Sequence, residues 1–351
     1  MTLAPTLATY SAVVALLTAL GIEGMRRWGT RRLLDIPNER SSHTRPTPRG
    51  GGLPIIAVAL GAWVWSQGID GILGGSGILV LVLGAVIVAL VSWIDDLQGL
   101  PFRQRLGAHL VAGTLVLWNA PPPASVFLPW VGELPLGLLA WPLALVWIAG
   151  LTNAFNFMDG IDGIAGGQGL VAALGWVALG LTFHANFIAA LGLFLAVGCA
   201  VFLVFNWPPA RIFMGDVGSA TLGFLFAAMP FVMNASPFTP ERSFWIVGVA
   251  FVWPFVFDTG FTLVRRWRRR EKVTDAHRTH LYQRLVIAGW SHAKTSLLYI
   301  GWAASTSIAG WAMAKEIPSS GLFGLAWAAW SGVMVWRLVV AAEGDPAVAT
   351  K

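Results

Sequence analysis

Eleven apolar runs, separated by short polar gaps, decide what this chain can fold into. A helix needs about 20 apolar residues to cross the roughly 30 Å hydrocarbon core of a bilayer. The runs lie near 6–24, 52–67, 76–94, 106–119, 136–155, 164–182, 185–205, 217–234, 243–264, 294–314 and 320–341. Charged residues make up 11% of the chain, against about a quarter in a soluble protein. We therefore expect an all-α, polytopic integral membrane protein with about 11 transmembrane helices, of which the short second and fourth runs are the weakest candidates.

The distribution of basic residues gives this arrangement an orientation. Gaps that follow odd-numbered runs hold 19 of the 23 Lys and Arg residues, with Lys294 at the border of the tenth run counted among them. Basic residues gather on the cytoplasmic side of membranes, so we place these gaps and the C-terminus in the cytoplasm and the N-terminus outside. The first run shows no small-residue cleavage site, and we expect it to be retained. The net charge of +6 favours contact with the anionic lipid bilayer and an anionic substrate, and no nucleic acid is expected.

A polar stripe follows the fifth run. Asn153, Asn156, Asp159 and Asp162 recur at every third residue, and Gly160 interrupts the pattern. Helical spacing places the first three on one face, at the mouth of a membrane helix, where polar groups are costly. Helix capping would explain one or two of these residues, but four at fixed spacing indicate a site.

A glycine-rich basic loop precedes the second run. His43, Arg45 and Arg49 stand beside Gly50–Gly52, and glycine amides can approach a phosphate closely. Anchoring to lipid headgroups is the alternative, and it suits the basic residues between 26 and 32 well.

Two further gaps carry carboxylates. Asp95 and Asp96 end the third run, with Arg105 downstream, and Asp216 stands between two glycines before the eighth run. Adjacent acids at a helix C-terminus oppose the helix dipole and each other, which is an odd choice for a purely structural pair. Asp216 could also be a simple N-cap.

The ninth run and its following gap complete the polar inventory. Asp258 is embedded within the run, and either a catalytic or a hydrogen-bonded structural role fits it. His277, Arg278 and His280 follow; two His three apart on a helix share a face and could hold a phosphate or a metal.

All of these clusters except Asp258 fall in gaps on the same side of the membrane. Acids mixed with Arg, His and Gly indicate a metal-bridged phosphate site, and Asp and Asn oxygens suit Mg²⁺, with Mn²⁺ as the alternative. Such a site serves phosphoryl transfer, which depends on positioning and charge neutralisation. We treat residues 1–351 as one membrane-embedded domain with functional loops near 25–51, 95–106, 153–164, 206–219 and 265–293.

These motifs resemble the polyprenyl-phosphate N-acetylhexosamine-1-phosphate transferase superfamily, glycosyltransferase family 4. The resemblance rests on Asp95-Asp96-Leu97, the Asn153–Gly163 stripe, Phe213-Met214-Gly215-Asp216 and the His loop, which occur in order over nearly the whole chain. Residues 35–43 and 277–283 most resemble the WbpL-like branch of the WbpL/WecA-type enzymes that initiate O-antigen.

The resemblance implies an activity and its components. Undecaprenyl phosphate would attack the β-phosphate of a UDP-N-acetylhexosamine with Mg²⁺, giving a polyprenyl-diphospho-sugar and UMP at the cytoplasmic face of the bacterial inner membrane. The pathway implied is O-antigen, lipopolysaccharide or related surface polysaccharide synthesis. Oligomeric state is open, and a homodimer is compatible with the sequence.

The resemblance also implies residue roles. Asp95 and Asp96 match the catalytic pair, and Asn156 and Asp216 match metal ligands. The substrate-binding positions would be His43, Arg45, Arg105, Asn153, Asp159, Asp162, Phe213, His277, Arg278 and His280.

One departure bears on the donor. Many relatives have His-x-His-His where this chain has His280-Leu281-Tyr282-Gln283, which weakens an assignment to the phospho-MurNAc-pentapeptide transferases of peptidoglycan synthesis. A transporter of a lipid-linked solute is the alternative from another class, but it would place polar groups near the bilayer midplane in paired repeats, and no such repeats are visible.

Overall fold

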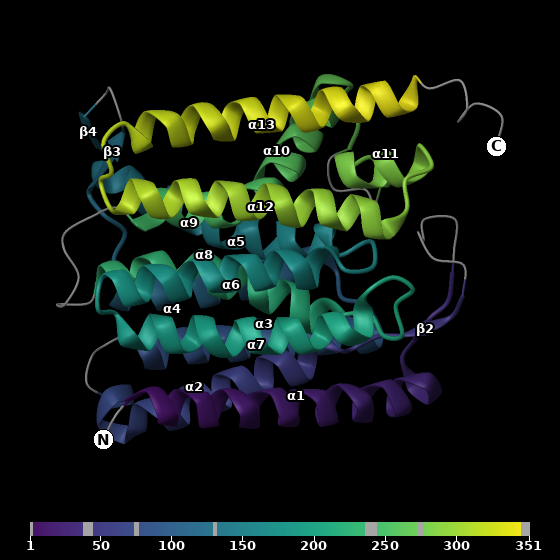
Figure 1. Cartoon of the computed structure of the whole chain (residues 1–351), viewed down its shortest axis with the longest axis horizontal. Helices are drawn as coiled ribbons and strands as arrows, with labels where there is room; N and C mark the ends of the chain where they lie inside the picture. Colours follow the sequence, from purple (N-terminus) through teal and green to yellow (C-terminus); the bar gives the residue numbers. More distant parts are fainter. Residues whose placement is uncertain are drawn as a thin grey trace.

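The computed structural model describes residues 3–37, 45–73, 77–128, 132–235, 244–272 and 277–344. Its helices lie side by side, from α1 at one edge to α13 at the other (Figure 1). Without water in the hydrocarbon, a helix satisfies its backbone groups internally, and each apolar run of the sequence accordingly contains a helix. The helices are α1 (Leu3–Arg32), α2 (Gly52–Leu73), α3 (Ile78–Gln98), α4 (Phe102–Asn119), α5 (Ala140–Met158), α6 (Ile164–Thr182), α7 (Asn186–Asn206), α8 (Asp216–Asn234), α9 (Phe244–Phe251), α10 (Trp253–Arg268), α11 (Leu281–Ile287), α12 (His292–Ala314) and α13 (Ser320–Glu343).

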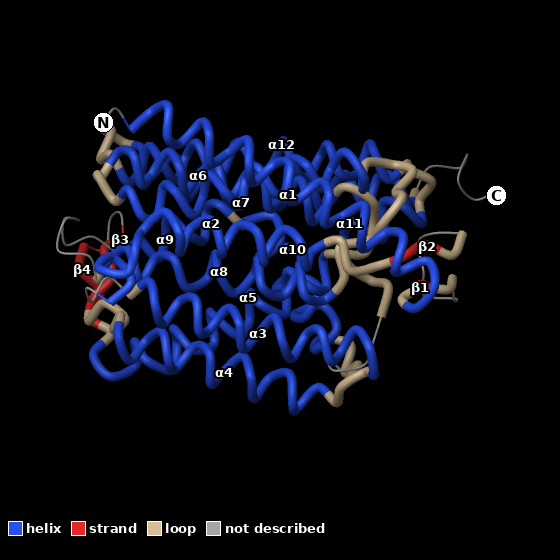
Figure 2. Tube along the Cα trace, turned by 90° about the horizontal axis from the view of Figure 1, so that it is seen from below, coloured by secondary structure: helices blue, strands red, loops and turns tan. Residues whose placement is uncertain are grey.

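Short strands mark the two ends of the helix bundle. The antiparallel pair β1 (Leu34–Asp35) and β2 (Thr47–Pro48) lies at the same end as α11, and the hairpin of β3 (Ser125–Leu128) and β4 (Gly132–Pro135) lies at the opposite end (Figure 2). A 3₁₀ turn, Gly137–Leu139, leads from the hairpin into α5. Helix α1 begins at the hairpin end and α13 ends at the β1–β2 end, so the described chain starts and finishes on opposite sides of the bundle.

Membrane spans can be compared with the predicted eleven. Among the described residues, seven helices are long and apolar enough to cross a membrane, and the bent pair of α9 and α10 would make an eighth. Helix α2 contributes a shorter apolar helix over Gly52–Gly68. The protein is therefore a mostly helical, multi-pass membrane protein, and the count of eleven crossings stays a prediction.

The ninth apolar run differs from the expected single helix. It is broken at Val252, where α9 and α10 meet at 82°. Pro254 stands at the start of α10, and proline has no N–H for the helical ladder. The side chain of Gln168 in α6 donates to the carbonyl of Phe251 at 2.8 Å, which satisfies a backbone group that the break leaves inside an apolar environment.

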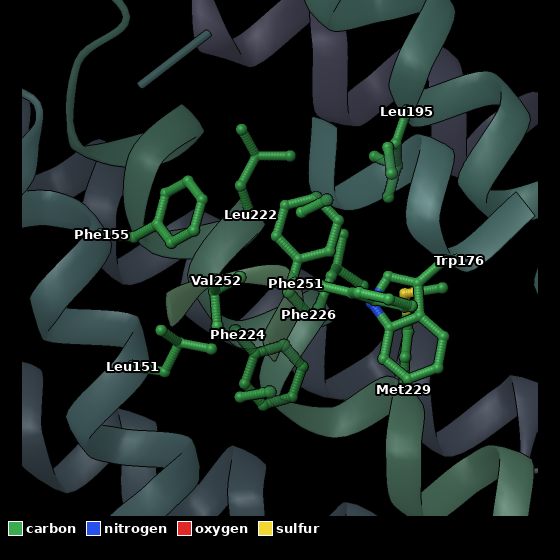
Figure 3. Packing of buried hydrophobic residues seen from close by; sticks show 14 of the residues in the cluster. Leu151, Phe155, Trp176, Leu195, Leu222, Phe224, Phe226, Met229, Phe251 and Val252 are labelled. Carbon is green, nitrogen blue, oxygen red and sulfur yellow. The ribbon is translucent and has the colours of Figure 1, made fainter. Parts of the chain in front are cut away.

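Helix α8 forms the centre of the molecule. Its residues from Val217 to Met233 are all buried, and α2, α3, α4, α5, α6 and α9 surround it. Figure 3 shows the packing around Leu222, Phe224 and Phe226 of this helix. Close approach requires glycine at Gly223, where a Cβ would lie 2.7 Å from the Leu151 carbonyl oxygen.

We expect Gly223→Ala to lower the free energy of unfolding by about 1–3 kcal/mol, because an added methyl group must push α5 and α8 apart. The matched control is Gly61→Ala in α2, where a Cβ would meet nothing within 4 Å. Thermal unfolding in detergent measures both, and equal midpoints for the two variants would contradict the packing argument.

Candidate active site

The glycine-rich loop pairs with the loop that leads into α8. Arg49 and Phe213 form a parallel β-bridge. The Phe213 amide donates to the Pro48 carbonyl at 2.8 Å, and the Gly51 and Gly52 amides donate to the carbonyls of Phe213 at 2.9 Å and Met214 at 2.8 Å. The first and the fourth of the five predicted functional loops are thereby joined backbone to backbone.

This pairing corrects the expected role of the glycine run. The Gly51 and Gly52 amides were predicted to face a phosphate, but they are used by the neighbouring loop. A Cβ on Gly52 would lie 2.2 Å from the Cα of Gly218, so glycine is needed here because two backbones touch.

Three carboxylates meet where α3 ends and α8 begins. Asp95 Oδ2 lies 2.7 Å from Arg105 Nη1, and the same nitrogen lies 3.6 Å from Asp216 Oδ2. Asp96 leaves α3 on a different side from Asp95, as expected for adjacent residues on a helix, and reaches the first turn of α8, where its Oδ2 accepts from the Val217 amide at 3.3 Å. Arg105 therefore bridges two acids that lie 121 positions apart in sequence, counting from Asp95 to Asp216.

The cluster retains polar atoms that no described residue satisfies. Asp96 Oδ1 is buried without a hydrogen-bond partner in the described chain, as are Nε of Arg49 and of Arg105. Arg49 Nη1 approaches Asp96 Oδ1 to 3.7 Å, which is too long for a hydrogen bond. Buried polar atoms are normally satisfied, so one acceptor and two donors stand ready for a ligand.

The residues at this cluster fit a magnesium ion whose other ligands would come from a substrate phosphate and water. The side chain of Asn156 contacts the Asp216 carboxylate, and both carry the oxygen atoms that Mg²⁺ prefers. No group of three or more His, Cys, Asp or Glu in the described residues is placed to hold a metal by itself. Mg²⁺ usually takes one or two protein carboxylates and fills its shell with water and substrate phosphates.

The residues of the polar stripe have different partners: Asn156 belongs to the carboxylate cluster, and Asn153 contacts helices α4 and α5. Asn153 is within 3.2 Å of His109 Nδ1 and donates to the Ala149 carbonyl, while Asn156 reaches Asp216. Helix α5 ends at Met158, just before the Gly160 that was predicted to break it.

Asp162 holds the loop before α8 and the start of α12 through its carboxylate. Its Oδ2 accepts from the Ala210 amide at 3.0 Å, and its Oδ1 lies 3.3 Å from His292 Nδ1 of α12. The neighbouring Gly163 amide donates to Asn206. These contacts use the Asp162 carboxylate to hold the loop before α8, and its expected contact with substrate stays a prediction.

The sequence left open a catalytic or a structural role for Asp258, and its contacts indicate the structural one. It is fully buried. Its oxygens accept from the amides of Leu281 at 2.8 Å and Tyr282 at 3.1 Å and from the Tyr299 hydroxyl at 2.6 Å, and they lie 3.1 Å from His280 Nδ1. A carboxylate so fully engaged fixes the start of α11.

The His loop is not helical, contrary to the helix expected over 277–280, because α11 begins at Leu281. The rings of His277 and His280 nevertheless lie side by side, with centroids 4.9 Å apart. Burial, the neighbouring His280 and the cations of Arg266 and Arg265 lower the pKa of His277 to about 4.

The remaining predicted residues are more dispersed. Phe213 takes part through the backbone pairing, and Arg278 is half-buried beside Tyr282. Arg45 is exposed, with its carbonyl accepting from the Thr47 hydroxyl. His43 lies outside the described residues.

Sequence reasoning missed His109, Asn206 and His292. His109 follows Arg105 by one helical turn, a spacing that places both on one face of α4 and that could have pointed to it. Asn206 and His292 carry no comparable local signal.

Asp159 gives a prediction about pH. Burial and the carboxylates of Asp216, Asp96 and Asp162 raise its pKa well above the usual range. An acid that holds its proton more tightly when folded destabilises the fold as pH rises above its unfolded pKa.

We therefore expect Asp159→Asn to gain stability over the wild type as pH rises from 5 to 8, by up to about 1.4 kcal/mol per pH unit. Unfolding in detergent with a chelator present measures the difference. Asp162→Asn is the control and should lose stability throughout this range, and a pH-independent difference for Asp159→Asn would refute the argument.

Known proteins resemble this chain over most of its length. Residues 78–234 match the model of glycosyl transferase family 4. A probable undecaprenyl-phosphate N-acetylglucosaminyl 1-phosphate transferase of Bacillus subtilis (strain 168) is 29% identical over 293 residues, which are 82% of this chain and 79% of that protein.

Two further relatives are at least as similar in identity. A phospho-N-acetylmuramoyl-pentapeptide-transferase of Synechococcus sp. (strain JA-3-3Ab) is 30% identical over 311 residues, covering 85% of this chain and 88% of the relative. A decaprenyl-phosphate N-acetylglucosaminephosphotransferase of Mycobacterium tuberculosis (strain ATCC 25618 / H37Rv) is 31% identical over 292 residues, covering 76% of this chain and 72% of the relative. With this coverage and with the clustered motifs, the chain belongs to glycosyl transferase family 4, the superfamily of polyprenyl-phosphate N-acetylhexosamine-1-phosphate transferases.

Proposed function

We propose that this protein transfers N-acetylhexosamine-1-phosphate from a UDP-N-acetylhexosamine to undecaprenyl phosphate and releases UMP. The observation that carries the proposal is the meeting of Asp95, Asp96 and Asp216 with Arg105 and Arg49 at one end of the helix bundle. There a lipid headgroup in the membrane and a nucleotide from the aqueous phase can reach the same charges. The relatives named for polyprenyl-phosphate transfer support this choice.

The reaction balances without further reactants. An oxygen of the lipid phosphate attacks the β-phosphorus of the UDP-sugar. The bond between that phosphorus and the bridging oxygen breaks, and UMP leaves with the bridging oxygen. Phosphoryl transfer depends on holding these groups in line and on neutralising their charge.

The residues present suggest a division of labour. Arg105 and Arg49 would bind phosphate oxygens through their free donor atoms, and the adjacent Asp95 and Asp96 would orient or deprotonate the lipid phosphate. Asp216 and Asn156 would hold Mg²⁺, which supplies charge neutralisation for the diphosphate when it is bound. His277, Arg278 and His280 would bind the sugar phosphate of the donor from the neighbouring loop.

Location and pathway complete the proposal. The positive-inside distribution supports a site at the cytoplasmic face of a bacterial inner membrane, and the WbpL/WecA-type motifs favour O-antigen or a related surface polysaccharide.

Peptidoglycan synthesis is the second candidate, because one relative is a phospho-N-acetylmuramoyl-pentapeptide-transferase. Tyr282 and Gln283, which replace two His of the common motif, favour the first candidate. A comparison of UDP-GlcNAc with UDP-MurNAc-pentapeptide as donors decides between the two.

A transporter has little support in the geometry. Asp258 lies within the bent span and is fully engaged by hydrogen bonds. A transport path would need such a group free to exchange partners near the midplane.

We expect Asp216→Asn and Asp95→Asn each to lower kcat at least about a hundredfold, because each removes a charge that acts on the reacting phosphates. Purified variants are assayed for UMP release in the presence of undecaprenyl phosphate. Glu133→Gln, in the hairpin at the opposite end of the bundle, is the control and should keep wild-type activity. Wild-type rates in the two site variants would remove the assignment.

We expect a chelator to abolish the transfer and added Mg²⁺ or Mn²⁺ to restore it, because the oxygen ligands at Asn156 and Asp216 suit these ions. Rates are measured against free metal concentration. The Asp216→Asn variant should need more metal than the wild type, and activity that survives chelation would contradict the metal assignment.

A further inference from the structure

Tyr282 joins two parts of the candidate site that lie far apart in sequence. It is the second residue of α11 and is fully buried. Its hydroxyl donates to the carbonyl of Phe157 at 3.0 Å, in the last turn of α5. Carbonyls in the last turn of a helix have no helical partner, so this bond satisfies a group that would otherwise be left open.

Gly160 provides the space for this contact. A Cβ at Gly160 would lie 2.1 Å from the Tyr282 hydroxyl oxygen and 3.1 Å from the Cζ atom of the same ring. The turn that follows Asn156 and Asp159 is therefore shaped around this phenol, with no room for a larger residue.

The other side of Tyr282 is held to the His loop. Its amide donates to Asp258 Oδ2 at 3.1 Å, and the hydroxyl of Tyr299 donates to the same oxygen. Its ring stacks on the ring of His280 with centroids 5.9 Å apart, and the Gln283 side chain accepts from the His280 amide at 3.2 Å. Tyr282 is thus fixed at its backbone and its ring before its hydroxyl reaches α5.

We propose that Tyr282 is a positioning residue, which sets the spacing between the Asn156–Asp159 turn and the His277–His280 segment. The proposal rests on the proposed function, in which Asn156 holds the Mg²⁺ that acts on the donor's diphosphate and the His277–His280 segment binds the sugar phosphate of the same donor. A ligand that bridges two segments binds best when their spacing is fixed in advance. The phenol supplies that fixed spacing.

The lipid acceptor should not depend on this link. Asp96, Arg49 and Arg105 are held by α3, α4 and the backbone pairing of the glycine loop. The amide and the hydroxyl of Tyr282 bond to Asp258 and to Phe157 instead, which lie in α10 and α5. Loss of the hydroxyl therefore predicts a change for the donor alone, which a general loss of packing would not produce.

The first test is Tyr282→Phe, which keeps the ring and removes the bond to Phe157. We expect the KM for UDP-GlcNAc to rise about tenfold and the KM for undecaprenyl phosphate to stay within about twofold. Ser331→Ala is the matched control: it removes a buried hydrogen bond, from Trp302 at 2.8 Å, between α12 and α13. A lower melting temperature with both KM values unchanged in Tyr282→Phe would overturn the proposal.

The second test uses the contact with Gly160. Gly160→Ala should raise the donor KM strongly, because the methyl group collides with the hydroxyl oxygen. The same change in the Tyr282→Phe background should cost several-fold less, because the colliding oxygen is gone. Independent effects of the two substitutions would count against the link.

Hydrogen exchange separates this proposal from the proposed function. Amides of residues 157–163 should exchange faster in Tyr282→Phe than in the wild type, and Ser331→Ala should leave them unchanged. If the wild type transfers no N-acetylhexosamine phosphate yet this exchange pattern appears, the function fails and the link stands. If transfer occurs and exchange and the donor KM do not change, Tyr282 does not position the site.

Discussion

Helix α8 is enclosed by other helices along its length. Its first residue, Asp216, lies where the ends of neighbouring helices bring further charged residues together, and the candidate site depends on that placement. Such enclosure requires small residues where a neighbour comes close. Gly218 leaves room for the glycine loop, and Gly223 leaves room for α5. Asp216 is thereby presented between the ends of α3 and α5. Since close van der Waals packing and interhelical hydrogen bonds stabilise helix association in a membrane, the same packing that stabilises the bundle also positions the charges.

The cluster holds more negative than positive side chains. Asp95, Asp96 and Asp216 face two guanidinium groups, those of Arg105 and Arg49. Repulsion among the acids costs stability, and the arginines offset part of that cost. A divalent cation would add the positive charge that this cluster lacks, and phosphoryl transfer depends on such neutralisation of charge.

The sequence predicted the helices well because each apolar run must satisfy its own backbone in lipid. It also predicted that Asp95, Asp96, Asn156, Asp159 and Asp216 converge. It could not predict partners, because an apolar run shows that a residue avoids water and not which residue it meets. The glycine run illustrates this, since glycine serves backbone contact as well as anion contact. Asp162 looked like its neighbours in spacing, and only the loop at Ala210 and the ring of His292 distinguish it.

The backbone bridge between Arg49 and Phe213 joins two segments that leave the ribosome at different times. A ribosome delivers the glycine segment early and the segment before α8 much later, because domains emerge from the N-terminus onward. Until then the amides of Gly51 and Gly52 lack the Phe213 and Met214 carbonyls that accept from them in the folded chain. Insertion of the early helices and assembly of the candidate site are consequently separate events, because the Arg49–Phe213 pairing can form only after the segment before α8 has been made.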